Sequence, residues 1–404
     1  MLASGVALTG CSALIGVNDI YVSGETEGGA AADSARDSTF TDSDLQSDGG
    51  AETGPCVADL QNDVKNCGRC GHDCRGGTCA AGKCQAVELA VVANAPFNHI
   101  VVSTQHVFVS TQINLTTEVG GLWRVPKSGG GAELYVPASF RYAEQMAIVG
   151  DTLYFTVDDE PTNGTTQFGG FYSCPVIGSA PCAPTLLASA DSPGGVTTDR
   201  GRVFYSDDAT GKGWMVYTPG GGAPTVFIDG YGPLSSMFVD GTSAFYSYTT
   251  FTSPQRARLI EAYADGGIVE RYNYESPTAE DGVLLGSPNA LLFTAYDFAN
   301  TSEGVVRRIP RNGTVLPCSY GGVTNKRPYG LYFDANRIFW TNQGEGAAGS
   351  FAGGGVLACD LAGCCAAADE LWSGTGQPTA LTGDADAVYW VTRSGSGVWK
   401  VAKP

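Results

Sequence analysis

A short apolar segment that ends in a large, usually aromatic residue and is usually followed by Ser or Thr recurs seven times along the chain. The copies are Val107–Ser110, Leu153–Thr156, Val203–Ser206, Phe245–Ser247, Leu291–Thr294, Ile338–Thr341 and Val388–Val391. Successive copies lie roughly 41 to 50 residues apart, which is the spacing of propeller blades that contain four strands each. The pattern therefore predicts an all-β, seven-bladed β-propeller, with six or eight blades as the alternatives.

Three further strands are expected around each copy. A segment such as Gly330–Phe333 precedes it and forms the innermost strand of the blade. After a loop comes a strand that begins with glycine, such as Gly397–Val401, and then a fourth, outermost strand such as Pro224–Phe227. Each blade is therefore a sheet whose four strands run outward from the axis in chain order.

The last blade lacks its outermost strand, because the chain ends at Pro404 after the third one. A matching strand, residues 87–92, stands at the other end of the predicted propeller, residues 86–404, and is similar to Asp369–Trp372. We expect this N-terminal strand to complete the seventh blade. A closed ring has no open sheet edge between its first and last blades.

The N-terminus indicates export. A short apolar run, shorter than a membrane span, leads into Leu8-Thr9-Gly10-Cys11, which resembles the bacterial lipobox. Residues 1–11 are therefore predicted to be a lipoprotein signal segment with Cys11 as the lipidated residue, on the outer membrane or cell surface. No Lys or Arg precedes the run, so we expect the true start to lie upstream; the alternative is a buried apolar segment with an incidental cysteine.

Residues 12–55 are predicted to be a disordered acidic tether. Most of this segment consists of Gly, Ala, Ser, Thr, Asp and Glu, with Phe40 and Leu45 nearly alone as large apolar residues. Such a composition cannot bury enough apolar surface to offset the entropy of ordering the chain. The tether would separate the lipid anchor from a folded body.

Residues 56–85 form a cysteine-rich segment with three possible chemistries: a zinc site, a redox motif or a set of disulfides. Its six cysteines are Cys56, Cys67, Cys70, Cys74, Cys79 and Cys84. In an exported chain an even number of closely spaced cysteines favours a small module with three disulfides, and zinc is the alternative. Six cysteines allow fifteen connectivities, and the spacing does not select one.

Disulfides are also expected inside the ring. Cys174 and Cys359 occupy equivalent positions at the ends of third strands, and each has a partner shortly before the fourth strand. The predicted partners are Cys182 for the first and Cys364 or Cys365 for the second. Cys318 and the remaining cysteine of that pair are left unassigned.

The segments Phe339-Trp340-Thr341-Asn342 and Val388-Tyr389-Trp390 resemble the strand motif of YWTD-type and TolB-like propellers. The resemblance implies a propeller that is used mainly for binding, and it carries over no ligand. It departs from the motif where Val109 or Phe293 replaces the tryptophan, and YWTD domains proper have six blades.

Charge and motifs limit the chemistry. The formal charge of −18 argues against nucleic-acid binding, which needs a cationic surface. Neither the sialidase box nor a Gly-x-Ser-x-Gly elbow with a downstream histidine is present. We expect no catalytic residue, metal or cofactor, and leave enzymatic activity open. The alternative is a calcium-dependent hydrolase of the lactonase type, for which Asn98, Glu144 and Asp281 stand at inner-strand starts.

The residues predicted to bind a partner lie on one face of the ring. His99 is expected near the axis as a polar residue of the rim, beside Asn98. The long, unequal loops between second and third strands carry four further candidates, Phe168, Phe251, Phe298 and Phe351. These aromatic residues either form a binding surface or pack locally to order the loops. The sequence thus predicts a monomeric binding or scaffolding module for an unknown protein or glycan.

Overall fold

The computed structural model describes most of the chain from residue 59 onward. The described residues are 59–111, 120–137, 140, 143–157, 169–190, 193–207, 213–228, 236–241, 243–250, 255–263, 267–276, 279–287, 290–297, 304–311, 318–321, 325–345, 353–363, 365 and 367–404. Every helix or strand element within these ranges is a β-strand. None of the described residues belongs to a helix that is long and apolar enough to cross a bilayer.

The first four blades are four-stranded antiparallel sheets in which the strands follow chain order from the axis outward. The first comprises β4 (Phe97–Val102), β5 (His106–Thr111), β6 (Gly121–Pro126) and β7 (Glu133–Val136). The second comprises β8 (Ala143–Val149), β9 (Thr152–Val157), β10 (Gly170–Pro175) and β11 (Thr185–Ser189). The third comprises β12 (Pro193–Asp199), β13 (Arg202–Asp207), β14 (Gly213–Tyr217) and β15 (Thr225–Ile228). The fourth comprises β16 (Ser236–Asp240), β17 (Ser243–Thr250), β18 (Gln255–Tyr263) and β19 (Ile268–Ser276).

Three more sheets complete the ring, and the last of them takes one strand from the N-terminal side. The fifth blade comprises β20 (Ala279–Gly286), β21 (Ala290–Asp297), β22 (Gly304–Pro310) and β23 (Cys318–Tyr320). The sixth comprises β24 (Pro328–Phe333), β25 (Arg337–Asn342), β26 (Gly354–Asp360) and β27 (Asp369–Gly374). The seventh comprises β28 (Pro378–Gly383), β29 (Ala387–Thr392), β30 (Gly397–Ala402) and β3 (Val87–Val91).

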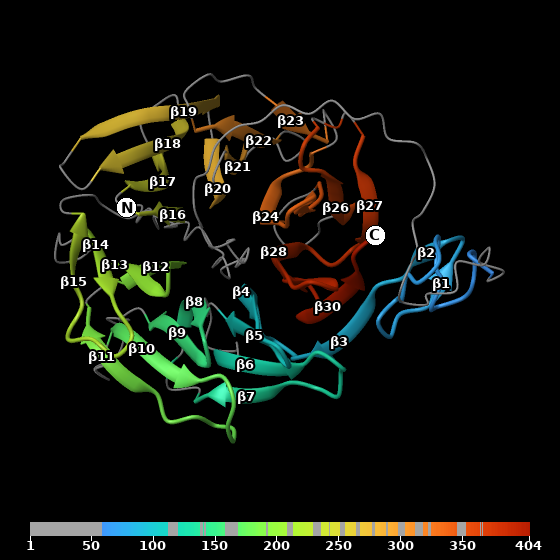
Figure 1. The fold of residues 1–404 in the computed structure, drawn as a ribbon, viewed down its shortest axis with the longest axis horizontal. Helices are drawn as coiled ribbons and strands as arrows, with labels where there is room; N and C mark the ends of the chain where they lie inside the picture. The colour runs from blue at the N-terminus through green and yellow to red at the C-terminus, as the bar shows by residue number, and fades with distance from the viewer. Residues whose placement is uncertain are drawn as a thin grey trace, which may run out of the picture.

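The seven sheets form a closed ring around a central axis (Figure 1). Each innermost strand contacts the innermost strand of the next blade, and β28 of the last blade contacts β4 of the first. The prediction of a seven-bladed β-propeller is therefore confirmed. The outermost strand of the seventh blade is β3, which pairs antiparallel with β30, so the two ends of the propeller meet in one sheet.

Buried hydroxyl groups on the second strands hold neighbouring blades together. Six residues at equivalent positions, here called the blade hydroxyls, have fully buried side chains: Ser110, Thr156, Ser206, Ser247, Thr294 and Thr341. Thr341 Oγ1 accepts a hydrogen bond from the Gly330 N–H of its own inner strand (2.7 Å) and donates one to the Thr379 carbonyl of the next blade (2.7 Å). The recurring Ser or Thr in the sequence pattern thus links adjacent inner strands.

Other blade hydroxyls make the same kinds of bond. Thr294 accepts from the Val283 N–H (2.7 Å) and donates to the Tyr329 carbonyl of the sixth blade (3.2 Å). Thr156 donates to the Gly194 carbonyl of the third blade (2.8 Å). Val283, Tyr329, Gly330 and Thr379 are buried, so each of their peptide groups left without a partner would cost about 1 to 3 kcal/mol.

The inner strands are irregular where they receive these bonds. The pairing of the first and second strands shifts register in all blades except the fourth, as between Pro328 and Leu331 of β24. Gly330 lies inside this bulge, and a Cβ there would approach the Thr379 carbonyl oxygen to 2.2 Å. Only glycine lets the hydroxyl and both backbones come this close.

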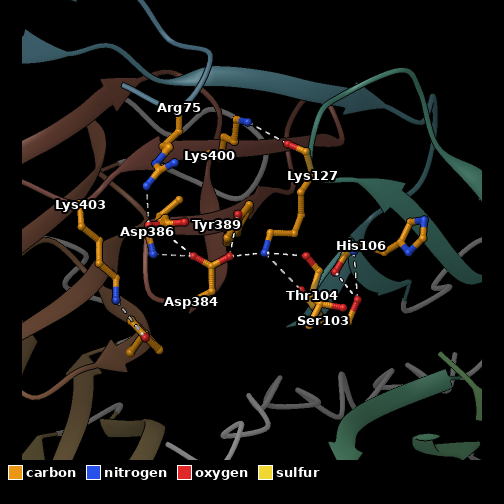
Figure 2. Close-up of polar contacts among 12 residues, drawn as sticks. Arg75, Ser103, Thr104, His106, Lys127, Asp384, Asp386, Tyr389, Lys400 and Lys403 are labelled. Carbon is orange, nitrogen blue, oxygen red and sulfur yellow. Dashed lines mark hydrogen bonds and ion pairs between the residues drawn. The ribbon is translucent and has the colours of Figure 1, made fainter. Parts of the chain in front are cut away.

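The seam between the seventh and first blades is closed differently, because Val391 stands where the other blades have a hydroxyl. Thr379 Oγ1 instead lies 3.5 Å from the Phe97 carbonyl of the first blade. At the turns on the opposite face, Lys127 of the first blade forms an ion pair with Asp384 of the seventh and also donates to the Ser103 and Thr104 carbonyls (Figure 2). Lys400 of β30 donates to the Lys127 carbonyl at 2.8 Å.

Asp384 is the acceptor at the centre of this network. It also accepts from the Tyr389 hydroxyl (2.9 Å) and from the Ala387 N–H (2.9 Å). Burial alone would raise the pKa of Asp384, but the hydrogen bonds from Lys127 and the backbone outweigh it and lower that pKa. Its contribution to stability is therefore present at neutral pH and lost as the pH falls below the usual range of an aspartate.

The segment that precedes the propeller is a small module packed against the last blade. It contains the hairpin of β1 (Cys79–Ala80) and β2 (Lys83–Cys84) and the disulfides Cys67–Cys79 and Cys74–Cys84. Cys70 is also disulfide-bonded, and Cys56 lies outside the described residues. The sulfurs of Cys67, Cys74 and Cys84 lie within 4.8 Å of one another, which is close enough to suggest a metal site. All three are in disulfides and so offer no thiolate to bind zinc, which favours the disulfide interpretation over the zinc one.

Two disulfides in the ring connect the third strand of a blade to the turn that follows it. Cys174 pairs with Cys182, and Cys359 pairs with Cys365. The structure thus selects Cys365 from the two partners that the sequence left open for Cys359. Cys364 and the side chain of Cys318 lie outside the described residues.

The Thr341→Val substitution tests the link between blades. Valine keeps the shape of threonine but leaves the Gly330 N–H and the Thr379 carbonyl without the hydroxyl, so we expect the free energy of unfolding to fall by about 2 to 3 kcal/mol. Chemical denaturation measures the loss. The control is Thr185→Val on the exposed outer strand β11, which should change stability by less than about 0.5 kcal/mol. Equal effects of the two substitutions would contradict the role of the hydroxyl.

Candidate functional site

Four of the residues that the sequence singled out for binding lie on inner strands, near the points where these strands begin. Asn98 and His99 lie on β4, Glu144 on β8 and Asp281 on β20. The side chains of Glu144 and Asp281 lie outside the described residues, as do Phe168, Phe251, Phe298 and Phe351. The described part of the structure therefore does not show whether the proposed calcium ligands lie close together or whether the four phenylalanines form one surface.

His99 was expected at the polar rim, and that expectation is wrong. Its side chain is fully buried, and burial lowers its pKa to about 3. The cause is a bulge: the register of β4 shifts between Phe97 and His99, so that His99 pairs with Ser110 and its side chain turns into the protein. His99 therefore stays neutral across the physiological range, and Asn98 beside it is also buried.

A group of buried polar residues on the same face was not foreseen from the sequence. This inner polar cluster consists of Arg327, Gln343 and Gln377. The Gln343 N–H donates to the Arg327 carbonyl (3.1 Å), and the Gln377 side-chain amide donates to that of Gln343 (3.3 Å). The cluster thus joins the sixth and seventh blades where their inner strands begin.

Arg327 extends the cluster to the fifth blade. Its guanidinium carbon lies 5.1 Å from the ring centre of Tyr296 on β21, within the range of a cation–π contact. Its backbone has a φ of 56°, in the left-handed region. The sequence held one signal for these residues: Arg327 and Gln377 each directly precede the proline that starts an inner strand.

A surface hollow of about 530 Å³ lies next to the cluster, at the seam between the seventh and first blades. It is here called the seam hollow, and its lining residues are Val91, Ala93, Asn94, Pro96, Arg393, Gly395 and Ser396. They come from the link between β3 and β4 and from the loop between β29 and β30. The Arg393 N–H donates to the Gln377 carbonyl (2.8 Å), which connects the hollow to the cluster.

The lining combines apolar surface with one positive charge. The side chain of Val91 is 54% exposed, and Ala93 and Pro96 lie beside it. Arg393 is exposed and forms no ion pair with any other residue that the structure describes. The lining includes no His, Cys, Asp or Glu, and so it offers no general acid or base, no nucleophilic thiol and no charged metal ligand. Its chemistry suits the binding of a partly apolar ligand that carries an acidic group.

No protein-family model matches the chain, and no curated protein matches its sequence. Solved structures do match its fold. A GH74 enzyme from Niastella koreensis aligns over 78% of this chain and 53% of its own, with 13% identity and a TM-score of 0.55. Virginiamycin B lyase from Staphylococcus aureus aligns over 79% of this chain and 99% of its own, with 14% identity and a TM-score of 0.52.

A third match is the β-propeller domain of the Trilobed protease from Pyrococcus furiosus, which has an open velcro topology. It aligns over 76% of this chain and 93% of its own, with 7% identity and a TM-score of 0.51. At these identities the matches show the propeller fold alone. They establish neither an activity nor membership of the YWTD or TolB-like families.

Proposed function

We propose that the chain is an exported, membrane-anchored lipoprotein whose propeller is a binding or scaffolding module for an extracytoplasmic protein or glycan. The observation that carries the proposal is the seam hollow. Among the residues that the structure describes, its lining offers apolar surface and an arginine without an ion pair, and it contains no His, Cys, Asp or Glu. A ring whose blades are joined by buried hydrogen bonds holds such a surface in a fixed shape. A preformed surface loses less conformational entropy when a partner binds.

The cysteines support export. All nine described cysteines with described side chains are in disulfides: Cys67, Cys70, Cys74, Cys79, Cys84, Cys174, Cys182, Cys359 and Cys365. Disulfides persist in oxidising compartments and are rare in the cytosol. This usage fits the proposed lipid anchor at Cys11 and the proposed tether that follows it.

The position of the cysteine-rich module supports the use of the seam hollow. The module contacts the turn between β28 and β29 through the Arg75–Asp386 ion pair, and it contacts Lys403 after β30. Both contacts lie on the face where the inner strands end. An anchor that approaches through this module would leave the opposite face, with the hollow, free for a partner.

Charge reversal in the hollow tests the binding proposal. The purified chain is screened on a glycan array and on an array of extended acidic peptides. For the probes that bind, we expect Arg393→Glu and Val91→Asp to lower the affinity at least tenfold, because the first reverses the charge of the described lining and the second adds an acid to its apolar side. The melting temperature should stay within about 2 °C of the wild-type value, since both side chains are exposed.

The matched control is Ile268→Asp on the outer strand β19, because Ile268 is 55% exposed and Val91 is 54% exposed. It should bind the same probes as the wild type. Wild-type binding by both hollow variants would move the site elsewhere. The absence of any bound probe on both arrays would remove the support for a binding module.

The anchor is tested separately. Expressed with a complete signal peptide, the wild type should partition into the detergent phase of a Triton X-114 extract, and Cys11→Ser should move it to the aqueous phase because the lipid is no longer attached. A Cys56→Ser variant controls for the loss of a cysteine and should remain in the detergent phase. A Cys11→Ser protein that still partitions with detergent would contradict the lipobox assignment.

A further inference from the structure

His72 of the cysteine-rich module contacts a backbone carbonyl with each of its ring nitrogens. Nδ1 lies 2.6 Å from the Cys67 carbonyl oxygen of the same module, and Nε2 lies 2.7 Å from the Lys403 carbonyl oxygen just beyond β30. One ring thus joins the module to the end of the last blade. Both partners are acceptors with no proton to give.

This geometry specifies a protonation state. A neutral imidazole carries one N–H, so it can donate to one of the two carbonyls and directs a lone pair at the other. Only the imidazolium form donates to both. We propose that protonated His72 is a pH-sensitive latch that docks the cysteine-rich module onto the last blade and that weakens when the ring loses a proton.

The surroundings of His72 leave its ring accessible to solvent. The ring is half-buried and lines a hollow of about 330 Å³ between the module and the turns of the sixth and seventh blades. The charged groups around this hollow are Arg69, Asp73 and Arg75 of the module, Asp334 and Arg337 of the sixth blade, and Asp386 and Lys403 of the seventh. Solvent can therefore reach the ring and exchange protons with it.

Most of these charges already have partners. The ion pairs are Lys65–Asp73, Arg75–Asp386, Lys403–Asp334 and Arg337–Asp369, and Arg69 has no ion pair with another described residue. Among the described residues around the hollow, each side-chain carboxylate has a cation as its partner, and the terminal carboxylate of Pro404 lies on the same lining. The groups that the ring itself contacts are the two carbonyls.

The latch matters because the other contacts of the module are weaker or non-directional. Arg75 and Asp386 are about half exposed, at 49% and 56%, and an exposed pair of this kind contributes little to stability. The disulfide-bonded cysteines pack around Ala402 of β30, a small apolar contact that does not fix an orientation. The His72–Lys403 bond is the directional polar contact between the buried part of the module and the strand end.

The sign of the pH effect follows from the bonds. Both exist while the ring is protonated, and one is replaced by repulsion between a lone pair and a carbonyl once the proton leaves. Histidine changes charge between about pH 5 and 8. Docking is therefore strongest at the acidic end of this range and weakens towards the alkaline end.

Two measurements on the full chain test the latch. The chain has three histidines, so long-range ¹H–¹⁵N spectra resolve their rings, and those of His72 should show both nitrogens protonated at about pH 5.5 and one at about pH 8.5. Hydrogen exchange follows the Cys67 and Lys403 amides, which belong to the two residues whose carbonyls the ring contacts and which donate within the module to the His72 carbonyl and within the seventh blade to the Asp386 carbonyl. After correction for the intrinsic rate, their protection should fall about tenfold between the two pH values.

Variants separate the latch from general effects of pH. His72→Gln should show the low protection at both pH values, whereas the control His106→Gln, on the first blade, should keep the tenfold change. A His72 ring with one protonated nitrogen at about pH 5.5 would overturn the proposal. Protection that is equal at both pH values in the wild type would overturn it as well. The ring spectra and the exchange rates of the wild type test the proposal even if His72→Gln fails to fold.

Discussion

The blade hydroxyls are the constraint on which the rest of the molecule depends. A hydroxyl such as that of Thr341 satisfies two buried peptide groups, one in its own blade and one in the next. The inner strands of the fifth and sixth blades can therefore bulge while their peptide groups stay hydrogen-bonded. Thr156, Thr294 and Thr341 tie the second, fifth and sixth blades to the blades that follow them. Where the series stops, at Val391, closure needs other groups: Thr379, the Lys127–Asp384 pair and the strand β3.

The seam hollow and the cysteine-rich module both lie at that seam. The seam hollow is lined by the link between β3 and β4, where an inner strand begins. The cysteine-rich module lies beside the last blade (Figure 1), and its His72 contacts the Lys403 carbonyl just beyond the end of β30. The reason is topological. A ring closed by a strand from the N-terminal side brings the first and last segments of the propeller together. The connections at residues 92–96 and 393–396 belong to no strand, and they meet at this seam and form the surface of the hollow.

The sequence predicted the repeating architecture well, because each blade carries its own local pattern of apolar and polar residues. It also contained the recurring Ser or Thr, but not its role, since the Thr379 carbonyl that Thr341 bonds is 38 residues away. His99 was misplaced because the bulge in β4 shifts the register between Phe97 and His99, and β4 has no glycine to mark it, unlike Gly330 in the bulge of β24. Arg393 and Val91 are far apart in sequence and meet only through closure, so no local motif could identify the hollow.

Native-state hydrogen exchange across β3 tests the central claim, that a ring closed by this strand is one rigid unit. If the claim is right, the β3 amides bonded to β30 open only with the whole ring, and their exchange at increasing denaturant converges on the same free energy and slope as the amides of Gly330 and Val283 beneath the blade hydroxyls. Exchange of β3 by a local opening that is several kcal/mol cheaper and independent of denaturant would contradict it, and would describe an open ring with a detachable strand.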